Sequence, residues 1–437
     1  PNRTNDATES GTISLKGQSP VYALTQQHHS RTDNVESFFN LLYERTISKD
    51  QSLKAEVANG IIRNKNKRSM TSESELMSYA NQNYLKESRL LFNASINYRQ
   101  KFNQYATMNV GSKTSYRNND FDDKLDAIPT YNFQSTTEYI YADVAGNVSK
   151  FSYKAGLGLD MVFNNAAGVH HQYYNLLGNA SLSYSFNQNN WTTLSGSRTR
   201  LSPSYTQMNP ENTSVDSLVV RVGNPYLEPA IFNSVQLSYS LNAKGFYVEP
   251  AVKFTQTNNN IRPLGTTEDN IYTSTFVNDG YTRNFTAGIT ARYNIGNIGG
   301  VNANVYYGSR RFEHSAMKGD YVSGSINVYL YYKKFNFNGG IYWIEPGYTE
   351  ISRNKATPSS SIALSYKIKP NWSVGFDFRD LCHRNYRSWT ETDGYYNYYQ
   401  SNSKSRDFMF LLKTYYSFSS KSKTKSRYVN RFSNSKE

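Results

Sequence analysis

Residues 235–241 read Val-Gln-Leu-Ser-Tyr-Ser-Leu, so apolar and polar side chains alternate one by one. Successive side chains on a β-strand point to opposite faces, and such a strand therefore has one apolar face and one polar face. The same alternation recurs in 176–186, in 372–378 and in further segments between residues 37 and 418. A strand that crosses a bilayer needs about 9–11 residues, with lipid on one face and water on the other. The repeated pattern predicts an all-β fold, an antiparallel transmembrane β-barrel.

The composition favours strands over helices as the membrane-spanning elements. Only 38% of the 437 residues are hydrophobic, and the mean hydropathy is -0.70. No segment approaches the roughly 20 apolar residues of a spanning helix, whereas half of the residues in a barrel strand face water. A soluble β-sandwich also alternates, but it seldom needs so many long strands. Aromatic residues make up 15% of the chain, which suits the aromatic girdles at the two membrane interfaces.

Charge and cysteine content exclude several other classes of protein. The net charge of +14 is scattered over strands, loops and the C-terminal tail, so we expect no nucleic-acid partner. Cys382 is the single cysteine, and no intrachain disulfide is possible. We expect no cofactor. The chain opens at Pro1 without a recognisable signal peptide, which predicts a mature or truncated product.

The pattern divides the chain into three regions. Residues 1–36 lead into the barrel and hold one candidate strand at 11–16. Residues 37–418 form the barrel, which we expect to have about 20 strands (roughly 18–22), since bacterial barrels normally have an even number. Residues 419–437 form a basic tail in the periplasm. The tail either contacts anionic partners or lipid head groups, or is only solvated.

The joins between the predicted strands are alternately short and long. Asn, Gly and Pro occupy the short joins, as expected for tight turns, and we assign these to the periplasm. The long joins then lie outside the cell. The short joins are 102–104, 187–190, 243–245, 295–297 and 369–371; the long ones are 65–88, 118–133, 204–232, 260–271, 313–322 and 382–393. The segments near 272–282 and 394–403 are predicted to be wall strands.

Two segments carry a motif that links an arginine-rich strand end to a Gly-Asn-Pro turn. Residues 197–205 read Ser-Arg-Thr-Arg-Leu-Ser-Pro-Ser-Tyr, Asn-Pro follows at 209–210, and residues 223–229 read Gly-Asn-Pro-Tyr-Leu-Glu-Pro. This passage resembles the barrels of TonB-dependent receptors, most closely the outer-membrane β-barrel family typical of Bacteroidota. Ala230 stands where that family usually has an acidic residue. We expect a structural role for the motif residues Arg198, Arg200, Pro203, Tyr205, Asn209, Pro210, Gly223, Asn224, Pro225, Leu227 and Pro229.

The resemblance covers residues 37–418 and implies an outer-membrane receptor that works with TonB. Receptors of this kind carry a plug domain of well over a hundred residues before the barrel. Residues 1–36 are too few for a plug. We therefore expect either the barrel part of a longer receptor or a relative that has no energised plug.

Few residues suggest catalysis or metal binding. The pairs His28-His29 and His170-His171 could help to bind a metal only in a loop, because neighbours on a strand point to opposite faces. Cys382 and His383, with Asp380 nearby, resemble a nucleophile and its base. A strand end that runs into an extracellular loop explains this group better, and we predict neither a metal site nor an enzyme.

Ligand contacts are expected from the lumen and from one aromatic loop. Six basic residues occupy polar-face or strand-end positions, where they could attract an anionic substrate or contact a plug, or simply pair with Asp160 and Asp377. The loop at 390–399 is aromatic enough to stack on a sugar or a peptide, unless it belongs to the upper aromatic girdle. The basic residues are Arg198, Arg200, Arg292, Arg310, Arg379 and Lys413; the aromatic candidates are Trp389, Tyr395 and Tyr398.

These features predict a protein of the Gram-negative outer membrane. The leading hypothesis is a TonB-dependent receptor-type barrel that takes up a large or scarce nutrient. The alternative is a plug-less, non-transporting barrel that serves as a scaffold subunit of a larger outer-membrane complex. The expected partners are outer-membrane lipids and lipopolysaccharide, together with a plug domain and TonB in the first case and surface lipoproteins in the second.

Overall fold

A computed structural model covers the chain and describes most residues between 3 and 417. The segments outside the described residues within this range are 14–21, 75–77, 104, 124–130, 213, 215–218, 270, 315–317, 344–346, 349–350, 357, 380–384, 393–394 and 403–408. Among the described residues, no helix is long and apolar enough to span a membrane. The predicted basic tail at 419–437 lies outside the described residues.

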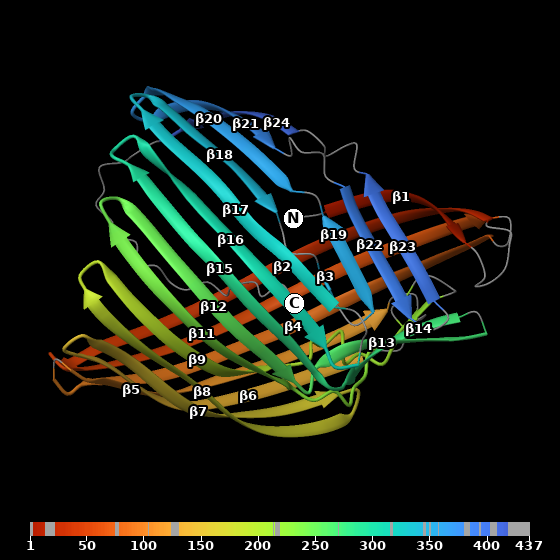
Figure 1. Ribbon diagram of the computed structural model, residues 1–437. Helices are drawn as coiled ribbons and strands as arrows, with labels where there is room; N and C mark the ends of the chain where they lie inside the picture. The colour runs from red at the N-terminus through yellow and green to blue at the C-terminus, as the bar shows by residue number, and fades with distance from the viewer. Residues whose placement is uncertain are drawn as a thin grey trace.

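One antiparallel sheet of 18 strands dominates the described part of the chain and confirms the predicted fold class. The sheet curls around a central space (Figure 1), and its strand number lies at the lower end of the predicted range. Each strand pairs with the next one in this order: β1 (Arg3–Ile13), β2 (Tyr22–Ser48), β3 (Gln51–Ser74), β4 (Ser78–Lys101), β5 (Thr107–Asp123), β6 (Tyr131–Val148), β7 (Phe151–Ala166), β8 (Val169–Asn187), β9 (Asn190–Leu201), β11 (Ala230–Ala243), β12 (Phe246–Asn258), β15 (Tyr281–Ile295), β16 (Gly299–Phe312), β17 (Lys318–Tyr332), β18 (Phe335–Trp343), β20 (Ser359–Lys369), β21 (Trp372–Arg379) and β24 (Met409–Tyr416).

Six further strands form two small sheets outside this wall. The first sheet has the order β10 (Val219–Arg221), β14 (Ile271–Asn278), β13 (Ile261–Glu268), and the second has the order β19 (Ser352–Ala356), β22 (Asn385–Thr392), β23 (Tyr395–Asn402). The predictions of wall strands at 272–282 and 394–403 are therefore wrong. Both segments are strands, but they pair with neighbouring loop strands instead of the wall.

The two ends of the wall differ as predicted. The five short joins predicted from Asn, Gly and Pro all connect paired neighbouring strands, and Lys244 and Gly245 take the positive φ values of a tight turn. Both small sheets lie at the opposite end, which carries the long loops (Figure 1). Not every join at this end is long, since only Ala167 and Gly168 connect β7 to β8. Outer-membrane barrels place their long loops outside the cell.

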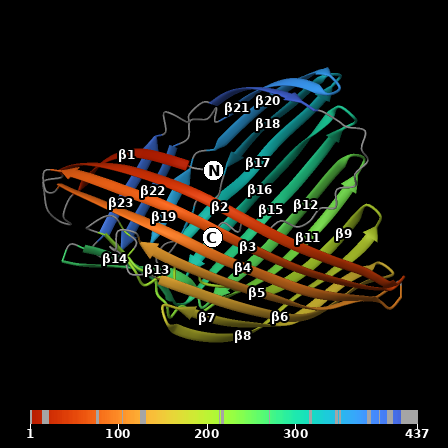
Figure 2. The same ribbon diagram turned by 180° about the vertical axis from the view of Figure 1, so that it is seen from behind.

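The strands β2, β3 and β4 are longer than the alternation predicts. The predicted long join at 65–88 is mostly strand, because β3 continues to Ser74 and β4 begins at Ser78. Part of the N-terminal segment 1–36 also joins the sheet as β1 and the first half of β2. Figure 2 shows these strands along the near side of the sheet. The part of a strand that extends beyond the membrane needs paired backbone groups but no apolar face. Strand bounds predicted from apolar alternation are therefore too short.

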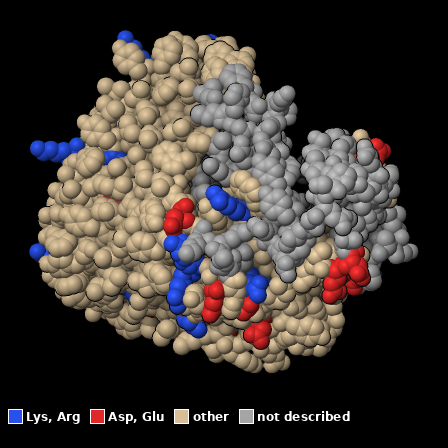
Figure 3. Space-filling view, turned by 45° about the vertical axis from the view of Figure 1, so that its right-hand side comes forward, with Lys and Arg blue, Asp and Glu red and all other residues tan. Residues whose placement is uncertain are grey.

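The outer and inner faces of the wall follow the alternation that the sequence shows. On β11, Val235 and Leu237 are 53% and 48% exposed, whereas Ser238 and Ser240 on the other face are buried. The exposed apolar rows continue across neighbouring strands, for example at Leu176 on β8. Figure 3 shows a broad surface largely free of charge, with most charged side chains gathered in one region. This arrangement fits lipid outside and water inside.

Candidate functional site

The loop between β9 and β11, which carries the sequence motif, packs against the wall at the long-loop end. Met208 and Leu227 are fully buried, and Tyr205 is nearly so. They form one apolar cluster with side chains of β6 and β7, among them Tyr131 and Ala166. Three other motif residues, Pro203, Asn209 and Pro229, are buried as well, together with the neighbouring Ala230. These buried residues anchor the loop against the wall.

Tyr205 lies between two arginines of the wall. The guanidinium carbons of Arg89 and Arg117 lie 4.9 and 4.8 Å from its ring centroid. Arg89 Nη2 donates to the Tyr205 hydroxyl oxygen at 2.6 Å and to Glu87 Oε2 at 2.8 Å. Burial and the Glu87 carboxylate raise the pKa of Tyr205, although the two arginines oppose the shift. The ring thus covers an ion pair between the half-buried Arg89 and the buried Glu87.

The Asn-Pro and Gly-Asn-Pro parts of the motif bind each other through their backbones. The amide of Gly223 donates to the Asn209 carbonyl oxygen at 2.6 Å, and the amide of Asn224 donates to the Gln207 carbonyl oxygen at 2.6 Å. A Cβ atom at Gly223 would lie 2.4 Å from the Gln207 oxygen. Only glycine allows this approach. The structure explains why the two parts of the motif occur together.

The Gly-Asn-Pro turn also connects the wall to the small sheet of β13 and β14. His171 Nε2 on β8 lies 3.0 Å from the Pro225 carbonyl oxygen. Asn224 Nδ2 donates to the Phe276 carbonyl oxygen of β14 at 3.0 Å, and the Glu228 amide donates to Asn278 Oδ1 at 2.6 Å. The motif loop, β8 and the small sheet of β13 and β14 are thereby linked into one structure that borders the mouth of the barrel.

The arginines of the motif have different surroundings. Arg198 pairs across the strands with Gly178 and Asn233, in the outer row that also contains Val235. The lumen-lining hypothesis is therefore wrong for Arg198, which donates to Asn233 Oδ1 at 3.2 Å. The pairing of β9 with β8 ends at this residue. Arg200, just beyond it, forms an ion pair with the buried Asp160 at 2.6 Å.

The other four basic candidates, Arg292, Arg310, Arg379 and Lys413, face the inside of the barrel. Arg292 alternates with the exposed Tyr293 on β15 and donates to Asn302 Oδ1 at 2.8 Å. Arg379 lies 3.5 Å from Asp377, which also pairs with Lys413. Arg200 with Asp160, and Arg379 and Lys413 with Asp377, thus form ion pairs of the kind that one of the two alternatives expected.

The aromatic candidates lie in the small sheet of β19, β22 and β23. The guanidinium carbon of Arg353 lies 5.5 Å from the Trp389 ring and 5.9 Å from the Tyr348 ring. In the register, Trp389 pairs with Tyr398, and Tyr395 pairs with Thr392. The side chains of Tyr395 and Tyr398 lie outside what the structure describes. Because this sheet is separate from the wall, these residues form no girdle within the wall strands.

The metal and nucleophile candidates gain no support from the described residues. They contain no group of three or more His, Cys, Asp or Glu side chains placed to hold a metal. His171 instead contacts the motif turn, while its neighbour His170 points to the other face of β8. The side chain of His28 and the residues Asp380, Cys382 and His383 lie outside the described part.

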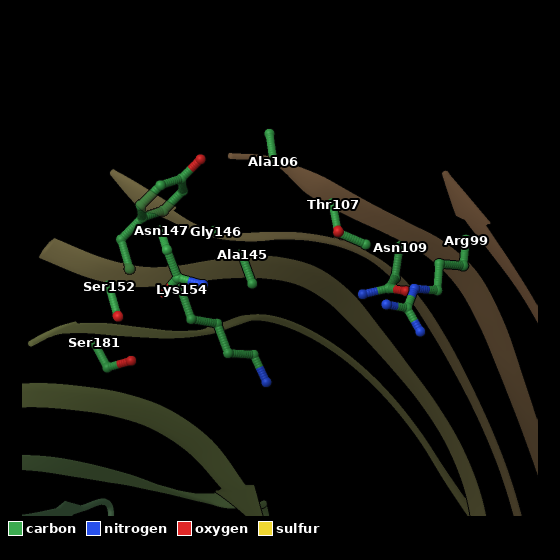
Figure 4. Close-up of a pocket in the computed structure, with 11 residues that line it drawn as sticks. Arg99, Ala106, Thr107, Asn109, Ala145, Gly146, Asn147, Ser152, Lys154 and Ser181 are labelled. Carbon is green, nitrogen blue, oxygen red and sulfur yellow. The ribbon is translucent and has the colours of Figure 1, made fainter. Parts of the chain in front are cut away.

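The inner wall also has recesses that sequence reasoning missed. One, of about 490 Å³, lies near the short-turn end, where Arg99, Asn109 and Lys154 project from neighbouring strands into one space (Figure 4). A second, of about 620 Å³, lies near the long-loop end and includes Arg310. The polar halves of the alternating strands were the signal for an inner surface, but the residues that line each recess come from strands far apart in the sequence.

Comparison with known proteins agrees with this geometry. The sequence matches the profile of the outer membrane protein beta-barrel family over residues 64–418, which include the motif loop. The chain belongs to this family. As a member of this family, the protein is a β-barrel of the outer membrane of Gram-negative bacteria. A search of curated proteins by sequence gives no match.

Solved structures of outer-membrane transporters share the fold of this family barrel at low sequence identity. The ferric-catecholate import receptor Fiu of E. coli K12 aligns with a TM-score of 0.66 and 10% identity, over 95% of this chain and 75% of Fiu. The copper transporter OprC aligns with a TM-score of 0.63 and 10% identity, over 96% and 83%. The iron transporter FrpB of Neisseria meningitidis aligns with a TM-score of 0.55 and 9% identity, over 95% and 79%. The barrel resembles TonB-dependent receptor barrels in architecture.

Proposed function

We propose that this barrel is a TonB-dependent receptor that takes up a large or scarce nutrient and is not an enzyme. The observation that carries the proposal is the ordered loop structure at the mouth of the barrel. A passive pore needs only a wide opening, whereas a receptor needs a rigid surface that holds its ligand in place. The motif loop, bound to β8 and β14, supplies such a surface.

The structural neighbours support the same function. Fiu is described as an import receptor and OprC as a transporter, and the likeness extends to nearly the whole of this chain. The motif at 197–229 further supports membership of the branch typical of Bacteroidota. In this proposal a plug domain closes the lumen, TonB moves it, and lipid and lipopolysaccharide surround the wall.

Uptake in cells tests the proposal. Accumulation of radiolabelled metal chelates and oligosaccharides would be compared among the parent strain, a strain without this protein and a strain without TonB. We expect at least one compound whose uptake needs both proteins. A Gly223→Ala variant should lower that uptake, because the new Cβ displaces the motif turn. Gly196→Ala serves as the control, since its Cβ would lie in ordinary contact 3.6 Å from the Ser234 carbonyl oxygen. Unchanged uptake of every compound without this protein, together with stable co-purification of surface lipoproteins, would instead support the scaffold function.

A further inference from the structure

The recess of about 620 Å³ has a regular floor on the inner face of the wall. We call it the upper recess; β12, β15, β16 and β17 form its floor, and the first residues of β13 border it. Lys253 on β12 pairs across the strands with Thr286. Thr255 pairs with Asn284, which in turn pairs with Arg310. These residues face inward, because their neighbours Val252 and Phe254 are exposed on the outer face.

The charged side chains of the upper recess are basic. Among the residues that the structure describes, Lys253 and Arg310 line it and no Asp or Glu does. Arg310 Nη1 donates to the Tyr348 carbonyl oxygen at 3.3 Å, which holds the guanidinium at the border of the recess. Lys253 makes no ion pair with any residue that the structure describes. Charges of one sign in a concave site concentrate ligands of the opposite sign, so the recess favours an anion.

Hydroxyl and amide groups make up much of the remaining lining. Thr255, Thr282 and Thr286 border the space together with Asn284. Asn284 Nδ2 donates to Thr286 Oγ1 at 3.3 Å. A side-chain hydroxyl both donates and accepts hydrogen bonds. A ligand with many hydroxyl groups of its own can satisfy such a surface in many orientations.

Aromatic rings add flat apolar surface beside these polar groups. Tyr306 lines the upper recess and shares a hydrogen bond of 2.8 Å with Thr290, which orients its ring. The Tyr321 ring lies directly over Gly308, where a Cβ atom would come within 2.1 Å of it. Because the Tyr321 side chain is buried, the half-buried Tyr306 is the ring that offers a face to a ligand. Aromatic faces next to hydroxyls suit a sugar ring, which has an apolar C–H face and a polar edge.

We propose that the upper recess is a binding subsite for an acidic oligosaccharide. Its carboxylates would approach Lys253 and Arg310, its hydroxyls the threonines, and one ring face Tyr306. The two cations are separated by two strands and two residues of register, which places their Cα atoms about 12 Å apart. A chain of a few sugars spans this distance. The inference names a substrate class and rests on the proposed uptake function.

Calorimetric titration of the purified full chain in detergent tests the subsite. The probes are trigalacturonate and its methyl ester, which has the same sugars without charge. We expect trigalacturonate to bind and the ester to bind at least tenfold more weakly. Lys253→Gln, Arg310→Gln and Tyr306→Ser should each weaken trigalacturonate binding several-fold. Lys154→Gln is the matched control, since Lys154 also faces inward but lies in the recess at the other end.

The outcomes separate the subsite from the uptake function. Equal binding of acid and ester, no binding of either, or an equal loss in Lys154→Gln would overturn the subsite. Lys253 is exposed, so its variant keeps the test valid even where Arg310→Gln or Tyr306→Ser fails to fold. Specific binding in vitro without TonB-dependent uptake in cells would overturn the transport function alone, and uptake of a different compound without acid binding would overturn the subsite alone.

Discussion

The contact between Tyr205 and Arg89 can be tested with one hydroxyl group. Tyr205→Phe removes the oxygen that accepts the Arg89 N–H at 2.6 Å and keeps the ring between the two arginines. A hydrogen bond to a charged group contributes about 1.5–3 kcal/mol. The variant should therefore destabilise the closed position of the motif loop by this amount.

The free energy of loop opening is the quantity to measure, because the wall strands do not depend on this contact. Local opening sets the rate of amide hydrogen exchange. A loss of about 1.5–3 kcal/mol raises the open population roughly 10- to 150-fold. Mass spectrometry of peptides within 203–212 should show exchange faster by this factor, while peptides from β11 should exchange as before.

A second tyrosine in the same loop provides the control. Tyr226 is 67% exposed, and Tyr226→Phe removes a hydroxyl group that faces water. Its exchange should stay within a factor of about two of the parent, because surface substitutions usually change stability by less than 0.5 kcal/mol. Equal exchange in Tyr205→Phe and Tyr226→Phe would refute the anchoring role of the Tyr205 hydroxyl.

Three further predictions concern the turn, a loop ion pair and the outer face. Gly223→Ala should release the motif loop and expose 203–229 to limited proteolysis, since its Cβ would lie 2.4 Å from a carbonyl oxygen; cleavage at the parental rate would contradict this. Hydrogen bonds from Arg262 lower the pKa of Asp279 in the folded protein. The stability that this ion pair contributes is therefore complete above the unfolded pKa of about 3.9, and it is lost as the pH falls through the lower folded pKa. Amide hydrogen exchange in the β14–β15 turn should rise only in that acid range. Leu237→Lys on the outer face should reduce the free energy of folding into lipid vesicles by roughly 2–4 kcal/mol. Gln236→Lys on the inner face should reduce it far less, and equal losses for the two variants would contradict the assignment of the outer and inner faces.

The sequence alone was sufficient for the properties that depend on neighbouring residues. The alternation in 235–241 predicts which side chains face lipid, since side-chain direction along a strand has a period of two. The short Asn, Gly and Pro joins predict the tight turns at one end. The Gly-Asn-Pro motif predicts a structural loop, and the family match agrees with the resemblance that it suggested.

Only the tertiary structure decided which segments meet. Residues 271–278 and 395–402 have the local pattern of strands, but pairing partners are distant in sequence and no local pattern specifies them. The same reason explains the position of Tyr205 between Arg89 and Arg117, which lie more than 80 residues away along the chain. For Arg198 the sequence suggested an inner position, but its cross-strand partners place it in the outer row. The period of a strand is local, whereas register, closure of loops and the shape of a recess depend on contacts between distant strands.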